Sequence, residues 1–161
     1  MKDVELAYLA GIIDGEGCIS VTISHRHSGY GKFRIQVSIS NTNLKLIEKC
    51  KQIVGFGSIG KRTGSHIGKR TVYKLELSKY KKLYELLPKL IPFLIDKKRK
   101  AELTFELIKE KMKHEQHSKV VYDHYQKRIK TTTPILATQR EIEIMEEIRR
   151  LNEQIDKRAS A

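Results

Sequence analysis

The stretch LAYLAGIIDGEG at residues 6–17 is an apolar, small-residue run that ends in two acidic residues, each followed by a glycine. It has no proline and no β-branched run before Ile12, which predicts a helix over about residues 4–14. Gly15 and Gly17 are expected to end that helix. The sequence thus places two carboxylates where an apolar helix stops, and this position needs a physical explanation.

Directly behind the helix the hydrophobic pattern changes to a period of two. Two segments alternate apolar with polar residues on either side of a turn at 27–31, and their apolar members are Ile19, Val21, Ile23, Phe33, Ile35, Val37 and Ile39. This alternation predicts an antiparallel hairpin with one buried face. The other face would carry hydroxyls, an amide and cations, which can bind base edges and phosphates. A solvated sheet face is the alternative, and the near absence of Asp and Glu counts against it.

The remainder of the chain predicts a second pair of strands followed by helices. A short helix is expected to begin at Asn41, and strands are expected at about 57–62 and 69–78. Helices are expected after them. The first carries a stripe of leucines at 83–90 and is interrupted by Pro88 and Pro92. The next is a helix at 97–113 capped by Asp96, and the last is a helix at about 138–157. This order predicts one α+β domain over residues 1–161, with an αββαββα core, strands within about 18–78 and C-terminal helices within 80–158.

The positive charge is concentrated in one region of the chain. Of the net charge of +13, the stretch from Gly17 to Leu75 supplies +10, because it holds eleven Lys and Arg and the single acidic residue Glu48. A surface that binds a polyanion concentrates charge in this way and gains affinity by releasing counterions. Nucleic acid is favoured over an anionic membrane, since no stretch combines a basic face with an apolar insertion face.

Other features narrow the class of protein. The apolar runs are too short to span a bilayer, and Asp3 and Glu5 lie where a signal peptide would be basic, so an intracellular protein is expected. The host could be an organelle, an archaeon or a bacterium. Cys18 and Cys50 match no metal-ligand spacing, and both are expected to be buried small hydrophobic residues rather than a disulfide.

The segment LAGIIDGEG at 9–17 resembles the motif that gives the LAGLIDADG homing endonucleases their name. The predicted order of elements and the chain length are similar to those of the single-motif, homodimeric members. The resemblance is strongest in the motif, fair through the hairpin and through PFLIDKKRK at 92–100, and weak after about residue 115. A basic, alternating hairpin directly behind the motif makes the match more specific.

The spacing within the motif also suggests a packing surface. Ala7, Ala10, Gly11 and Asp14 lie three and four residues apart and share one helix face, where small side chains allow another helix to approach closely. Spacing alone fits packing within one domain equally well. In the family, two motif helices pack side by side beneath the DNA. One motif per chain therefore implies a homodimer and a near-palindromic DNA site.

The resemblance implies an active site at the end of the motif helix. It makes Glu16 the metal-binding carboxylate and the Gly15 carbonyl a neighbouring ligand, with Mg²⁺ as the expected ion because it takes such oxygens and binds phosphate. The archetype has Asp where this chain has Glu16, which adds one methylene of reach. Asp14 is expected to have a structural role at the helix end, with a second metal ligand as the alternative.

Three further residues match supporting positions of the family. Asn41 matches a polar residue that orients the attacking water, although an N-cap for the next helix explains it equally well. Lys97 matches a basic residue near the scissile phosphate, and Lys45 is a weaker candidate of the same kind. The alternative for both lysines is a solvated surface charge.

The outward row of the strands is expected to contact DNA. Its members are Ser20, Thr22, Ser24, Arg26, Lys32, Arg34, Gln36, Ser38, Ser40, Arg62, Arg70 and Lys74. Arg26 and Arg34 are the strongest candidates for guanine contacts, because a guanidinium can bond O6 and N7 together. Asn152, Lys157 and Arg158 could hold phosphates, or could simply form an exposed helix end.

The resemblance implies a site-specific endonuclease that makes a staggered double-strand cut in a long, near-palindromic target by metal-dependent phosphodiester hydrolysis. Two alternatives use the same fold. One is an intron RNA maturase, which would bind RNA and leave the acidic residues idle. The other is a DNA-binding regulator without catalysis.

Overall fold

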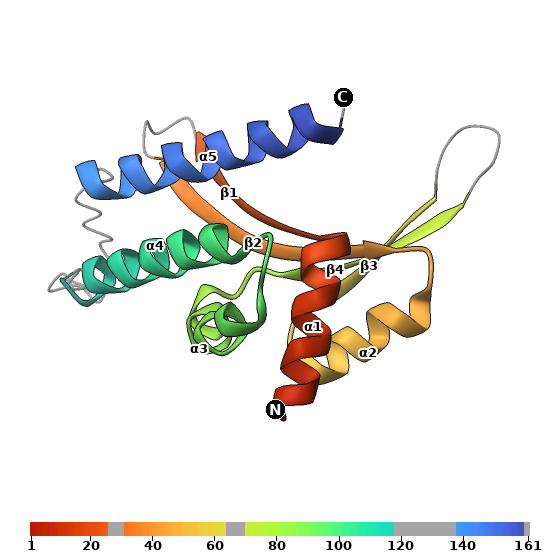
Figure 1. Cartoon of the computed structure of the whole chain (residues 1–161). Coiled ribbons are helices and arrows are strands. Elements are labelled where there is room, and N and C mark those ends of the chain that lie inside the picture. Colours follow the sequence, from red (N-terminus) through yellow and green to blue (C-terminus); the bar gives the residue numbers. More distant parts are fainter. Residues whose placement is uncertain (26–30, 64–69, 118–137, 160–161) are drawn as a thin grey trace, which may run out of the picture.

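The computed structural model describes residues 1–25, 31–63, 70–117 and 138–159. Its elements in chain order are α1 (Asp3–Glu16), β1 (Gly17–His25), β2 (Gly31–Asn41), α2 (Leu44–Val54), β3 (Ser58–Thr63), β4 (Thr71–Leu77), α3 (Tyr80–Leu90), the 3₁₀ helix η1 (Ile91–Phe93), α4 (Lys98–His117) and α5 (Gln139–Ala159). The predicted α+β class and the order of helices and strands are confirmed (Figure 1). The turn expected at 27–31 lies mostly outside the described residues.

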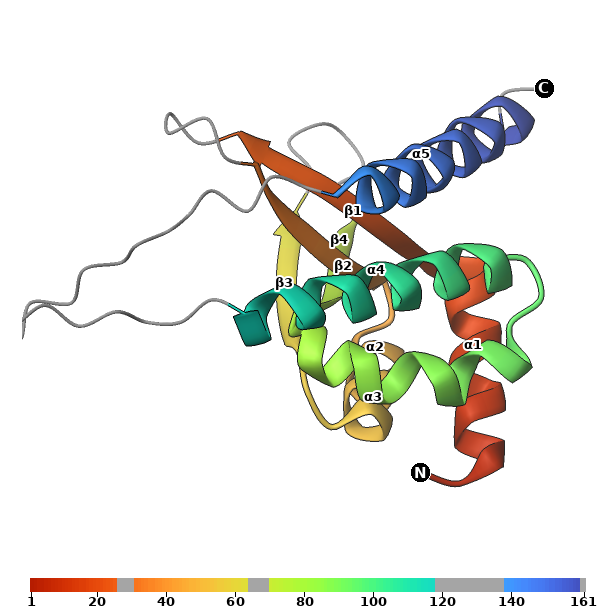
Figure 2. The same ribbon diagram turned by 90° about the vertical axis from the view of Figure 1, so that its left-hand side faces the viewer.

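The four strands form one antiparallel sheet in the order β1-β2-β4-β3. Helices α1 to α4 lie on one side of it, and α5 passes along the edge strand β1 and packs on α4 (Figures 1 and 2). The apolar members of the alternating strands face these helices, and the most buried are Ile19, Ile35, Val37, Ile39, Leu75 and Leu77. The period of two therefore leaves the opposite face of the sheet to polar residues.

The first helix ends later than its sequence suggests. It continues through Gly15 to Glu16, so the expectation that Gly15 ends it is wrong, and Gly17 is the C-cap whose N–H donates to the Ile13 carbonyl. A Cβ added at Gly17 would lie 2.6 Å from that carbonyl oxygen, whereas one added at Gly15 would meet nothing within 4 Å. Only Gly17 is required for the tight passage from helix to strand.

The second helix begins later than expected as well. Asn43 is its N-cap, because its Oδ1 accepts from the backbone N–H of Lys45 at 3.0 Å and of Leu46 at 3.4 Å. Asn41 remains in β2, paired with Tyr73, and its Oδ1 accepts from the Asn43 N–H at 2.8 Å. The expectation that Asn41 begins and caps this helix is therefore wrong, because the strand ladder holds it.

The C-terminal helices depart from their predicted limits in two places. Helix α3 continues through Pro88 to Leu90, and α4 begins at Lys98. The Lys97 carbonyl accepts the first helical bond of α4, from the Ala101 N–H at 2.9 Å. No capping bond from Asp96 is found among the described residues; its carboxylate lies 3.5 Å from the Lys97 ammonium instead.

Helix α5 packs on α4 through buried apolar side chains and is also joined to it by two exposed ion pairs. Arg99 contacts Glu147 at 2.8 Å and Arg140 contacts Glu106 at 2.7 Å, in each case between a guanidinium nitrogen and a carboxylate oxygen. On the same helix Ile144 and Ile148 are buried in the core.

Candidate active site and nucleic-acid interface

The acidic end of α1 is exposed. Glu16 is the last residue of the helix, and both its side chain and Gly15 are accessible to solvent. A carboxylate at a helix C-terminus is unfavourable, because the helix dipole already carries partial negative charge there. Helix α1 has no basic residue in its own last turn to offset this. The nearest compensation comes from a segment far along the chain.

That segment is the loop between η1 and α4. Asp14 accepts two backbone hydrogen bonds from it, Ile95 N–H to Oδ2 at 2.7 Å and Lys97 N–H to Oδ1 at 3.0 Å. Both carboxylate oxygens are thus engaged in fixing the loop against the helix end. This geometry leaves Asp14 poorly placed to serve as a second metal ligand.

The same contact buries Lys97. Its side chain is 8% exposed in the folded chain, and its Nζ donates to the Asp14 carbonyl. The alternative of a solvated charge is therefore wrong for Lys97. The ammonium group meets the negative end of α1 two residues before Glu16, so a cation and an exposed carboxylate lie at one helix terminus.

Asn41 ends β2, and Lys45 follows it in the first turn of α2. Strand β2 runs past the start of β1, because Gly17 pairs with Ile39, and α1 packs against β2. Asn41 is therefore placed near the level of the last turn of α1. Its amide oxygen is taken by the Asn43 N–H, which leaves the amide NH₂ to act as donor. Lys45 is exposed in the first turn of α2.

The polar residues of the strands line up across the open face of the sheet. Ser20 pairs with Gln36, Thr22 with Arg34, Ser38 with Glu76 and Ser40 with Lys74. Thr22, Arg34, Arg62 and Arg70 are exposed, whereas neighbouring side chains bury Gln36 and Ser38. Arg26 lies outside the described residues, as do the side chains of Ser24 and Lys32. A row of hydroxyls, an amide and cations therefore covers this face.

Two further residues lie on this face: Cys18, which was expected to be buried, and Glu76, which was not included in the expected DNA-contacting row. Cys18 is exposed and pairs with Ser38, so the expectation that it is buried is wrong, whereas Cys50 is buried. Cys18 lies two residues before the outward-facing Ser20 on the same strand, and this alternation predicts that Cys18 also faces outward. Glu76 lies among the cations, and the Lys74 ammonium beside it holds the pKa of its carboxyl below the usual range.

Asn152 is not at an exposed helix end. Its Oδ1 accepts from the Lys100 ammonium at 2.5 Å, and Lys100 is itself buried. The alternative of a simple exposed helix end is therefore wrong for Asn152, and phosphate binding by its amide stays a prediction. The side chains of Lys157 and Arg158 lie outside the described residues.

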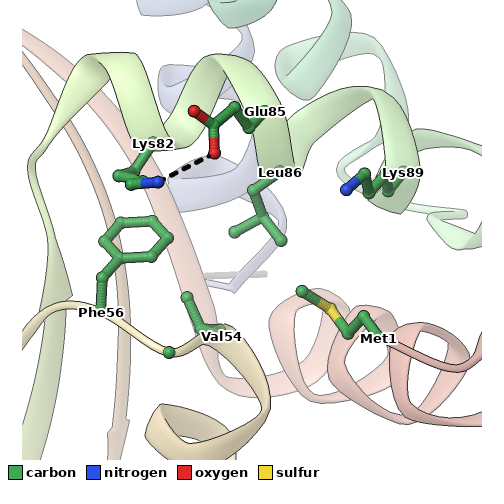
Figure 3. A pocket seen from close by; sticks show the side chains of 8 residues that line it. Met1, Val54, Phe56, Lys82, Glu85, Leu86 and Lys89 are labelled. Atoms are coloured by element: carbon green, nitrogen blue, oxygen red, sulfur yellow. Dashed lines mark hydrogen bonds and ion pairs between the residues drawn. The ribbon is translucent and has the colours of Figure 1, made fainter.

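A surface cavity of about 150 Å³ lies elsewhere, between the end of α2, helix α3 and Met1 (Figure 3). Its rim carries Lys82, Glu85 and Lys89, and the first two form an exposed ion pair at 3.1 Å. It contains none of the residues at the end of α1, and such an exposed pair carries little energy. We assign it no part in the active site.

The residues at the end of α1 fit a divalent ion only in part. In the part of the chain that the structure describes, no three His, Cys, Asp or Glu side chains gather as a metal cluster. Glu16 and the Gly15 carbonyl supply two oxygens. Mg²⁺ commonly binds one or two carboxylates and completes its shell with waters and substrate phosphates. The donor set suits Mg²⁺ held jointly with another ligand. No described helix is both long and apolar enough to cross a membrane.

Comparison with known proteins gives consistent results. The sequence model of the LAGLIDADG endonucleases matches residues 9–108. DNA endonuclease I-CvuI from Chlorella vulgaris is 29% identical over 110 residues, which is 66% of this chain and 65% of that protein. The chain thus spans slightly less than two thirds of this relative.

Solved structures show the same fold. A crystal structure of I-CvuI with the I-CreI target has a TM-score of 0.58 at 26% identity and covers 66% of each chain. The archaeal intron-encoded homing endonuclease I-Vdi141I, complexed with DNA, has a TM-score of 0.68 at 22% identity and covers 94% of this chain and 86% of its own. A mutant of I-SmaMI has a TM-score of 0.60 at 21% identity, and the match covers 89% of this chain but 43% of that one.

Proposed function

The chain belongs to the LAGLIDADG endonuclease family, and from this premise we propose that it is a homing endonuclease that cuts both strands of a long, near-palindromic DNA site. One observation carries the proposal. An exposed carboxylate and a buried lysine both lie at the end of α1, beside a sheet face covered with hydroxyls and cations. The relatives named above are DNA endonucleases, and none of their names supports the RNA maturase alternative.

In the proposed reaction, the chain's own residues bind and orient the DNA. The outward row of β1, β2 and β4 lies against the major groove, with Arg34 and Lys74 supplying positive charge. Lys97 stabilises negative charge on the scissile phosphate, and the Asn41 amide orients the attacking water. Glu16 and the Gly15 carbonyl would hold a divalent ion, with Mg²⁺ proposed. That ion would polarise the phosphate and promote deprotonation of a water molecule.

We propose that two copies of the chain act together through α1. Four residues at helical spacing on α1 are exposed, among them Val4 at 80% and Tyr8 at 45%, together with Ala7 and Gly11. Ala10 is buried in its own core and is therefore not available to a partner. A Cβ at Gly11 would meet nothing within 4 Å, so packing within the chain does not require this glycine.

Close approach of a second helix would explain the glycine. Glycine in a helix interior costs about 1 kcal/mol relative to alanine. Ile95, which is 89% exposed and donates to Asp14, extends the apolar surface toward the acidic helix end. Pairing of two such surfaces would bring two Glu16 carboxylates together, a repulsion that bound cations would relieve.

Gly11→Ala is expected to weaken the dimer about tenfold or more, because overpacking a close contact by one methyl costs about 1–3 kcal/mol. The same change should stabilise the isolated chain, since alanine favours the helix. Sedimentation equilibrium over a range of concentrations gives the dimer dissociation constant, and urea unfolding gives the stability. Gly60→Ala, which adds the same methyl on β3, is the control. An unchanged dissociation constant in the Gly11 variant would contradict helix pairing at this position.

The proposed activity is tested by cleavage of a randomised, near-palindromic plasmid library followed by sequencing of the cut ends. With Mg²⁺ we expect staggered ends at a single site. With Ca²⁺, a larger ion that takes six to eight ligands, we expect bound but uncut DNA. Selective DNA retention without cutting in any divalent ion would favour a non-catalytic DNA-binding protein. Retention of intron RNA in preference to duplex DNA would also defeat the proposal.

A further inference from the structure

Glu76 is an acidic residue in the middle of a cationic surface. It lies on β4, paired with Ser38 of β2 on one side and Ser58 of β3 on the other. Among the outward-facing sheet residues that the structure describes, it is the single carboxylate. Both of its lateral neighbours are serines, whose short side chains leave the carboxylate partly open to a ligand lying on this face.

The carboxylate is held by the cations and the amide around it. Lys74 Nζ lies 2.9 Å from Oε1 and Arg34 NH2 lies 4.0 Å from Oε2, and the Gln36 side chain also hydrogen bonds to it. These contacts lower the pKa of Glu76 and keep it ionised. Its side chain is still 32% exposed, so it can reach a bound molecule. Exposed pairs of this kind add little stability, which leaves the residue without a clear structural purpose.

A carboxylate on a DNA-binding face is repelled by phosphates and can gain only from donors on base edges. In the major groove the donors are the N4 amino group of cytosine and the N6 amino group of adenine. Adenine presents its N7 acceptor beside N6, and guanine and thymine present acceptors at the equivalent positions. Cytosine therefore offers the best partner for an ionised carboxylate.

The register also places Glu76 along the DNA-binding face. It shares one cross-strand row with Cys18 and Ser38, and Cys18 is two residues beyond Glu16. Cys18 and Glu76 are two strand spacings apart, roughly 10 Å. The row is thus close to the end of α1, and Arg34 and Thr22 lie further out along the strands.

Building on the proposed function, we propose that Glu76 determines specificity by accepting a hydrogen bond from the N4 amino group of a cytosine in the inner part of each half-site. Lys74 and Arg34, which hold the carboxylate in the free protein, are then available to the DNA. By two-fold symmetry the preference appears on opposite strands in the two half-sites.

The test is selection of binding sites from a library randomised across both half-sites, in Ca²⁺ so that no cleavage is needed. The wild-type protein should prefer cytosine about tenfold at one inner position of each half-site. Glu76→Gln should switch that position to adenine, because a glutamine amide bonds both N6 and N7. Glu76→Ala should lose the preference and bind all sites more tightly. Glu48→Gln, which removes an exposed negative charge on α2, is the control.

Two outcomes would overturn the proposal. One is a uniform rise in DNA affinity with unchanged base preference in both Glu76 variants. That result would show that the carboxylate only weakens DNA binding by repelling the phosphates. The other is loss of a preference for guanine, the base that Arg34 is expected to contact, without a switch from cytosine to adenine. That result would show that Glu76 only positions Arg34. Cleavage of the selected site with Mg²⁺ is measured separately. A protein that binds with this base preference but does not cut would contradict the proposed nuclease activity and still support this role for Glu76.

Discussion

Glu16→Gln is expected to slow cleavage of a bound target about a thousandfold or more, with DNA affinity changed only a few fold. The amide keeps the shape of the side chain but removes the anionic oxygen that would bind the divalent ion. Loss of a metal ligand removes several kcal/mol of transition-state stabilisation, and each 1.36 kcal/mol is a factor of ten in rate. Single-turnover cleavage with Mg²⁺ measures the rate, and fluorescence anisotropy in Ca²⁺ measures the affinity.

The position of Glu16 makes this variant informative. The side chain is exposed at the end of α1, so its replacement should leave the folded chain intact. Neutralising it could even favour the helix terminus, because the dipole disfavours an anion there. Glu48→Gln is the matched control and should cleave as the wild type does. Cleavage by Glu16→Gln at the wild-type rate would eliminate Glu16 as the metal-binding carboxylate.

Lys97→Met is expected to reduce the single-turnover rate about 100-fold to 1000-fold, the effect of removing one preorganised electrostatic group. Methionine has a similar length and lacks the ammonium that meets the Asp14 carbonyl. Lys98→Met is the control, because the neighbouring lysine is exposed. The rate is measured at saturating DNA, so that a change in affinity does not enter it.

A structural role for Lys97 would give a different pattern. The Asp14 carboxylate bonds to the backbone of residues 95 and 97, and those bonds remain in Lys97→Met. We therefore expect the free energy of unfolding in urea to change far less than the rate. A variant that unfolds much more easily but cleaves normally while folded would show that the lysine only secures the loop.

Local patterns predicted much of the fold because periodicity is a local property. The alternation around Ile19 and Ile35 places the buried face of β1 and β2 correctly, and the leucine stripe at 83–90 marks the buried face of α3. The same period assigns Cys18 to the outer face. Its residue type suggested burial, and the position in the strand proved the better guide.

Some helix boundaries could not be settled from neighbouring residues alone. Asn41 and Asn43 both suit an N-cap, and Asn43 takes the role because Asn41 stays paired with Tyr73 in the sheet. Gly15 and Gly17 both suit a helix end, and the close approach of the Ile13 carbonyl selects Gly17. In each case a contact decided between two equivalent local choices.

By itself the sequence determined the order of elements, the inward and outward faces of the strands, the regional positive charge and the acidic end of α1. Only the tertiary structure decided that Lys97 and Lys100 are buried while Lys98 is exposed, and that Ala10 is buried while Gly11 is accessible. The reason is physical. Charge and periodicity are carried by adjacent residues, whereas burial within the run at 96–100 depends on α1 and α5, which lie far away along the chain.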